Sequence, residues 1–234
     1  MQIGYGGLLL VITQYLQFVL GYSPLKASLC FIPLAVAALI FNAAGAGLGM
    51  KFGNRPLMVV GLLICAVSFG VLAGMGPDDG PAKLFVGLFL VGAGSGLAMP
   101  AAINAIMGAV PPEHAGVSSA LNDTVQQTGA ALGVAIMGTV VTSRFTAGMP
   151  ADISGTARHS LGEAINTGDS QVIEAAKHAF THAASVAYIA GAVGVIAAAI
   201  VSFVVLRDVK PPVGPTENGE GSGSGSALVS AEAQ

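Results

Sequence analysis

Six apolar runs take up most of this chain, and each is about as long as a lipid bilayer is thick. A helix needs about 20 apolar residues to cross the hydrocarbon core, where only helices and closed barrels satisfy every backbone amide. Charged residues make up 9% of the 234 residues, whereas soluble proteins carry about 25%. The sequence therefore predicts an all-α membrane protein with six transmembrane helices. The predicted spans are residues 3–20, 25–50, 56–75, 82–110, 116–143 and 183–206.

Polar segments separate these runs. The segment at 76–81 reads GPDDGP, a strong turn signal. A longer polar segment, residues 144–182, precedes the last run, and we expect it to lie on the membrane surface with helical parts near 156–165 and 170–180. The last residues, 207–234, are rich in Pro, Gly, Ser and Glu. Such a composition cannot bury a core, so we expect a disordered tail that follows the transmembrane domain of residues 1–206.

Basic residues in the short connections predict the orientation of the chain in the membrane. Lys51 and Arg55 lie in one connection, and Arg207 and Lys210 follow the last run, on the same side of the membrane. Lys and Arg are enriched in cytoplasmic loops. We therefore expect a multi-pass protein of the cell (inner) membrane with both ends cytoplasmic and the loop 144–182 extracytoplasmic.

The fifth run carries a polar stripe. Ser119, Asn122, Asp123, Gln126 and Gln127 recur at the spacing of one helical face. Unpaired polar groups in hydrocarbon cost on the order of several kcal/mol each, so the stripe must face other helices or a water-filled cavity. Asp123 is the only acidic residue well inside a predicted span, which points to a transport pathway. It could equally lie near enough to the membrane surface to be solvated, and both interpretations stay open.

Isolated polar residues and glycines occur in the other spans as well. Gln17 and Asn104 either line a pathway or form hydrogen bonds between helices, and the second role is the more common one. Small residues four apart allow membrane helices to pack closely. Two glycine pairs have this spacing: Gly92 with Gly96, and Gly129 with Gly133.

Several function classes find no support in the sequence. No GxxxxGK[ST] phosphate loop, catalytic Ser/His/Asp arrangement or paired carboxylate stands out, so we expect neither an enzyme nor a bound cofactor. His178 and His182 are four residues apart, but no third ligand accompanies them, so we expect no metal site. The chain has no basic patch for nucleic acid.

Four segments together carry a more specific combination of residues. They are YLQFVLGYSPL at 15–25 (followed by Pro33), GAGSGLAMP at 92–100, PPEHAG at 111–116 and NDTVQQTGAALG at 122–133. In this order and spacing they resemble the C-terminal half of fourteen-helix drug:proton antiporters of the major facilitator superfamily. The resemblance implies that the six spans form one half of a major-facilitator-type bundle.

The resemblance also implies a function, the proton-coupled efflux of drugs or other small lipophilic or cationic compounds. The partners would be the lipid bilayer, a small-molecule substrate and protons. Candidates for the substrate or proton pathway are Asp123, Asn122, Gln126, Gln127, Ser119, Asn104 and Gln17. Lys51, Gly53 and Arg55 match the family's cytoplasmic loop motif, but Met50 stands at its acidic position, which weakens the comparison.

The first eight helices of such an antiporter have no counterpart in this sequence. We therefore expect transport to require a missing N-terminal half or a second copy of the chain. Two alternatives stay open. The chain could be a truncated, non-transporting membrane fragment that interacts with a full-length transporter, or an oligomeric six-helix channel.

Overall fold

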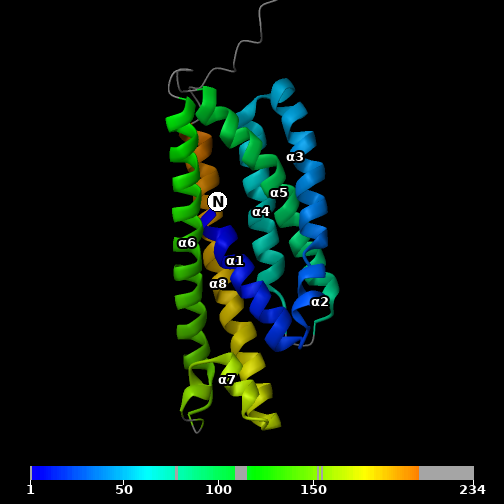
Figure 1. Cartoon of the computed structure of the whole chain (residues 1–234), viewed down its shortest axis with the longest axis vertical. Helices are drawn as coiled ribbons and strands as arrows, with labels where there is room; N and C mark the ends of the chain where they lie inside the picture. Colours follow the sequence, from blue (N-terminus) through cyan, green and yellow to red (C-terminus); the bar gives the residue numbers. More distant parts are fainter. Residues whose placement is uncertain (1, 77–78, 109–114, 152, 154, 206–234) are drawn as a thin grey trace, which may run out of the picture.

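Long helices that lie side by side form the body of the protein (Figure 1). The computed structural model describes residues 2–76, 79–108, 115–151, 153 and 155–205, and it has no β-strand within them. The helices are α1 (Gln2–Gln14), the π-helix η1 (Tyr15–Val19), α2 (Pro24–Leu29), α3 (Ile32–Phe52), α4 (Asn54–Ala73), α5 (Pro81–Gly108), α6 (Ala115–Gly148), the 3₁₀-helix η3 (Thr156–Arg158), α7 (Leu161–Asn166) and α8 (Ser170–Val205). The predicted tail at 207–234 and most of the connection at 111–115 lie outside the described residues.

Five helical segments within the described residues are long and apolar enough to cross a membrane, and the prediction of an all-α membrane protein is confirmed. The five segments are Pro24–Gly49, Asn54–Ala73, Pro81–Asn104, Gly116–Gly148 and Ser170–Val204. The first predicted run, 3–20, is not among them, because it consists of the 13-residue α1 and the 5-residue π-helix η1. A change from i→i+4 to i→i+5 hydrogen bonding divides that run.

The last span differs from its prediction. The helix α8 begins at Ser170 instead of residue 183, and α6 continues to Gly148 instead of ending at 143, so their connection is 149–169 instead of 144–182. The early turns of α8 bury Ala176, Ala179 and Phe180 but expose the polar side chains of Glu174 and His178 on the other face. The helical part predicted near 170–180 is thus the start of α8 and not a separate surface segment, because average hydropathy does not detect an amphipathic extension of a span.

Glycines bring neighbouring helices into close contact. A Cβ on Gly94 of α5 would lie 2.5 Å from the carbonyl oxygen of Gly61 on α4. Gly92, also on α5, lies against the backbone of Leu34 on α3. At such separations only glycine avoids overlap, so these residues set how closely the three helices pack.

The end of the bundle that is lowest in Figure 1 carries a small cap made of η3, α7 and the first turns of α8. Leu161 and Ala164 of α7 are buried, and they join the same apolar core as Tyr15 and Leu16 of η1. The ring of Phe18 lies beside Gly162, where a Cβ would be 3.6 Å from the ring. The cap therefore packs over the π-helical end of the first run.

Candidate functional site

The polar stripe lies on the N-terminal half of α6. Ser119, Asp123 and Gln127 are exposed, and Asn122 and Gln126 are half-buried. Helical periodicity thus places these five side chains along one strip of α6. Only one of them has a hydrogen bond to another helix within the described residues.

That hydrogen bond connects α6 to α1. Nε2 of Gln2 donates to Oε1 of Gln126 over 2.6 Å. The bond fixes the Gln126 amide at the point where α1 meets α6. Of the stripe, Gln126 is therefore the residue with a defined interhelical role, as is common for amides in membrane helices.

The next turns of the same α6 face pack against α1. A Cβ on Gly6 would lie 2.6 Å from the carbonyl oxygen of Ala130, and one on Gly133 would overlap the carbonyl of Ile3. The first residues of α1 thus lie against the middle of α6, as the N label in Figure 1 also shows. The polar half of α6 extends beyond α1, and its small-residue half is covered by α1.

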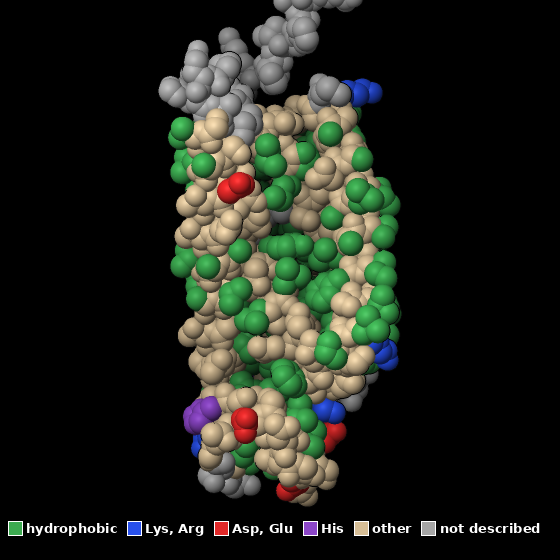
Figure 2. All heavy atoms as spheres, in the orientation of Figure 1, with side chains coloured by type: hydrophobic (Ala, Val, Ile, Leu, Met, Phe, Trp, Pro, Cys, Tyr) green, Lys and Arg blue, Asp and Glu red, His purple; other side chains and the backbone are tan. Residues whose placement is uncertain are grey.

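The uncovered polar half borders a hollow. In Figure 2 the surface is hollowed between the α6 side of the bundle and the side formed by α3–α5. Asp123 is the only acidic residue in α6. The ion pairs within the described residues are Lys83–Asp79 and His178–Glu174, so Asp123 has no ion-pair partner there.

The remaining pathway candidates, Asn104 and Gln17, do not both lie at the same end of the bundle as the polar half of α6. Asn104 is exposed near the end of α5, toward the same end of the bundle as Asp123. Gln17 is half-buried in η1, at the opposite end of the bundle. The structure therefore separates Gln17 from the polar half of α6.

The predicted loop motif forms the turn between α3 and α4. Lys51 is exposed in the last turn of α3, and Gly53 has φ +86°, a conformation that favours glycine. The Arg55 guanidinium carbon lies 4.1 Å from the centre of the Phe203 ring on α8. The three motif residues thus form one compact turn that contacts the end of the last helix.

The predicted glycine pairs lie at helix contacts. Gly92 and Gly96 both face α3, and a Cβ on Gly96 would be 2.8 Å from the carbonyl oxygen of Ala38. Gly129 and Gly133 face the start of α1.

Some contacts were not found by sequence reasoning. The close approach of Gly61 to Gly94 joins α4 to α5, and Gly61 with Cys65 has the four-residue spacing of small residues that could have indicated it. The Tyr15 hydroxyl donates to the carbonyl oxygen of Gly76 over 3.0 Å, which ties η1 to the α4–α5 connection. No sequence signal indicates a hydrogen bond to a backbone carbonyl so far along the chain.

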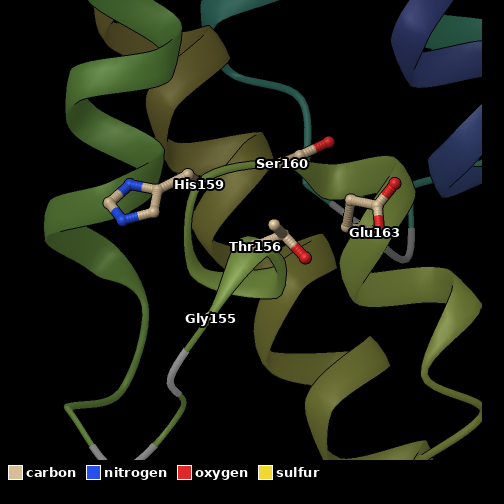
Figure 3. A pocket seen from close by; sticks show the side chains of 5 residues that line it. All are labelled: Gly155, Thr156, His159, Ser160 and Glu163. Atoms are coloured by element: carbon tan, nitrogen blue, oxygen red, sulfur yellow. The ribbon is translucent and has the colours of Figure 1, made fainter.

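A pocket in the cap is distinct from the hollow. Gly155, Thr156, His159, Ser160 and Glu163 line it (Figure 3). The His159 and Glu163 side chains point in different directions, and Nδ1 of His159 lies 3.3 Å from Thr146 Oγ1 on α6. No group of three or more His, Cys, Asp or Glu side chains in the described ranges is placed to hold a metal ion. The pocket lacks the converging charged groups of a catalytic or metal site.

Comparisons with known proteins identify relatives of this chain. A family model described as the Major Facilitator Superfamily matches residues 1–134. The multidrug efflux pump LfrA of Mycolicibacterium smegmatis is 30% identical over 218 residues, which are 88% of this chain and 43% of that protein. The puromycin resistance protein pur8 of Streptomyces alboniger is 35% identical over 145 residues, 60% of this chain and 29% of that protein.

The methyl viologen resistance protein SmvA of Salmonella typhimurium is a further relative, 31% identical over 194 residues, which are 77% of this chain and 39% of that protein. The chain thus spans less than half the length of these curated relatives. The names of the relatives agree with the prediction of a transport protein and not an enzyme.

Proposed function

The chain belongs to the major facilitator superfamily, and from this premise we propose that it is the C-terminal six-helix portion of a proton-coupled exporter of drugs or other small lipophilic or cationic compounds. Relatives named for multidrug efflux and for resistance to puromycin and methyl viologen support the proposed substrate class. In this proposal the protein lies in the cell (inner) membrane with both ends of the chain cytoplasmic.

The observation that carries the proposal is the uncovered polar half of α6. Asn122, Asp123 and Gln127 lie on a helix apolar enough to span a membrane, on the part of α6 that extends beyond the start of α1, where Asp123 and Gln127 are exposed and Asn122 is half-buried. Exposed to hydrocarbon they would be very unfavourable, so this face is suited to a water-filled cavity. We assign it as one wall of the transport cavity.

The other wall would come from a second bundle. Transport in this family of folds proceeds by rocking two bundles about a site near the middle of the bilayer, and the described residues supply one. We propose that a separate N-terminal half, or a second copy of this chain, supplies the other. The chain by itself would then bind substrate weakly and would not transport.

Asp123 is the proposed site at which a proton or a cationic substrate is bound. Its carboxylate can hold either one but not both at the same time, which is the requirement for exchanging one for the other across the membrane. Gln126 cannot take this role because it carries no charge and its amide oxygen is bonded to Gln2. Gln126 is instead a positioning residue for α1 against α6.

The decisive experiment is transport into vesicles under an imposed proton gradient. The full chain is reconstituted in vesicles either by itself or together with the N-terminal half of an efflux relative such as LfrA. The uptake of a lipophilic cation is then measured. We expect uptake only with both parts, and a loss of at least about tenfold on Asp123→Asn, because the remaining amide cannot carry the exchanged charge. Asp79→Asn is the matched control at the other end of the bundle, and it should retain uptake.

Two outcomes would contradict the proposal. Proton-driven uptake by the chain alone would show that no second bundle is needed.

Labelling of single cysteines tests the cavity wall separately, in a background that lacks Cys30 and Cys65. Equal protection from a water-soluble reagent at positions 122, 123, 121 and 125 would make the stripe a helix-packing surface.

A further inference from the structure

The turn between α3 and α4 carries two basic side chains, each beside an exposed aromatic ring. Nζ of Lys51 lies 5.7 Å from the centre of the Phe52 ring, and the Arg55 guanidinium carbon lies 4.1 Å from that of Phe203. The two rings are 60% and 55% exposed. Figure 2 shows a basic side chain at the upper right, at this end of α3 and α4. Cations and lipid-facing rings thus meet at one edge of the bundle.

Neither cation has an anionic partner in the part of the chain that the structure describes. The two ion pairs found there involve Lys83 and His178. Nε of Arg55 is shielded from solvent and has no hydrogen-bond acceptor among the residues that the structure describes. A shielded donor without an acceptor is unfavourable, and more so when it is charged. Among the described residues, no anion therefore accompanies the two basic side chains of this turn.

The backbone favours an anion at the same place. The helix α4 begins at Asn54, directly after Gly53, and no side chain caps its first amides. The N-terminal end of a helix carries a partial positive charge, and its free N–H groups bind phosphate oxygens. The uncapped start of α4 thus adds to the charge of Lys51 and Arg55.

The surface below the cations is apolar. Ile200, Val201 and Val204 of α8 are exposed on the same helix as Phe203. In a membrane protein such a surface contacts acyl chains. The charged turn and the apolar surface together therefore match a molecule with an anionic head and a hydrocarbon tail.

We propose that the α3–α4 turn binds the phosphate of an anionic phospholipid. Arg55 and Lys51 contact the phosphate oxygens, and an acyl chain lies along Phe203 and the exposed face of α8. A free phosphate ion would gain the charged contacts but not the apolar ones, and basic pockets at membrane helix ends are suited to lipid head groups. This inference does not depend on the proposed transport function.

Fluorescence quenching tests the proposal at the site itself. The chain has no tryptophan, so Phe203→Trp introduces a single tryptophan whose fluorescence can be excited selectively, and it preserves a ring for Arg55 to stack on. The full chain is reconstituted in vesicles of phosphatidylcholine with a brominated lipid as the quencher. We expect brominated phosphatidylglycerol to quench half-maximally at a mole fraction about 25-fold lower than brominated phosphatidylcholine, since Lys51 and Arg55 each contribute about fivefold.

Substitutions then assign the effect to particular residues. Arg55→Gln should reduce the preference for phosphatidylglycerol by about fivefold. Lys26→Gln is the matched control, because Lys26 also stacks on a ring (Tyr22, at 3.7 Å) but lies at the other end of the bundle. The control should keep the full preference.

Three results would overturn the proposal. The first is equal quenching by the two brominated lipids. The second is a loss of the preference for phosphatidylglycerol in Lys26→Gln that equals the loss in Arg55→Gln. The third is release of the quencher by millimolar inorganic phosphate, which would assign the site to a free anion. Native mass spectrometry of the chain with Phe203 intact gives a second readout. The unsubstituted chain should retain more bound phosphatidylglycerol than Arg55→Gln does, and equal retention would contradict the proposal.

Discussion

At Gly133 a single methyl group would push two helices apart. An added Cβ would overlap the carbonyl of Ile3, and a backbone cannot yield as a flexible side chain can. We expect Gly133→Ala to destabilise the protein by about 1–3 kcal/mol, measured by thermal unfolding in detergent. Gly138→Ala is the control on the same helix, because its Cβ would meet Leu10 at an ordinary 3.7 Å. Equal stabilities of the two variants would show that α1 and α6 do not pack as described.

The pairing of Asp79 with Lys83 in the α4–α5 connection should depend on pH. A hydrogen bond from Lys83, and then one from the N–H of Gly76, hold the pKa of Asp79 below its ordinary value of 3.8. Because the folded pKa is lowered, this pairing stabilises the turn at pH above 3.8 and is lost as the pH falls through the folded pKa. Lys83→Gln should therefore raise the pKa of Asp79 toward 3.8, as measured by carboxyl NMR titration. Lys26→Gln should leave it unchanged, and an unchanged pKa in Lys83→Gln would argue against the pair.

Among the elements, the π-helix η1 is the one most dependent on its neighbours. Its outer side lies under the cap, and its Tyr15 hydroxyl is bonded to Gly76. A π-helix is rare on its own, so the surrounding contacts hold it in this form. Leu161 of α7 packs the cap into the apolar core, and its side chain is 7% exposed.

Truncating Leu161 should therefore loosen η1. Leu161→Ala removes buried methyl groups, a change that costs about 2–5 kcal/mol, and we expect faster hydrogen exchange at Tyr15–Val19. Leu25→Ala serves as the control, because Leu25 is 73% exposed in the nearby α2. If exchange in η1 were the same in both variants, the cap would not be what holds the π-helix.

At the scale of the whole molecule, the connections alternate between the two ends of the bundle, so the orientation can be tested from one side. Lys51 and Lys83 lie at opposite ends (Figure 1). In a background without Cys30 and Cys65, an impermeant thiol reagent added to intact cells should label a cysteine at position 83. It should label one at position 51 only after the membrane is opened. The reverse pattern would place both ends of the chain outside.

Only part of the candidate site could be predicted from the sequence. The spacing of Asn122, Asp123 and Gln126 gave a polar strip, because side-chain direction along a helix follows from its period. It could not tell which turns of the strip would be covered. That depends on where α1 crosses α6, and the small residues that fix the crossing, Gly6 and Gly133, are far apart in the chain.

The sequence by itself determined the fold class and the position of most spans, because hydrocarbon imposes the same requirement on every apolar run: its backbone must bond within itself. The tertiary structure decided what depends on contacts between segments. It joined the helical part predicted near 170–180 to the last span as the single helix α8, and it placed Gln17 away from Asp123. It also covered the small-residue half of α6 with α1 and left the polar half open beside a hollow. Which face of a helix is covered depends on its close packing against another helix, and this packing is a property of the two helices together.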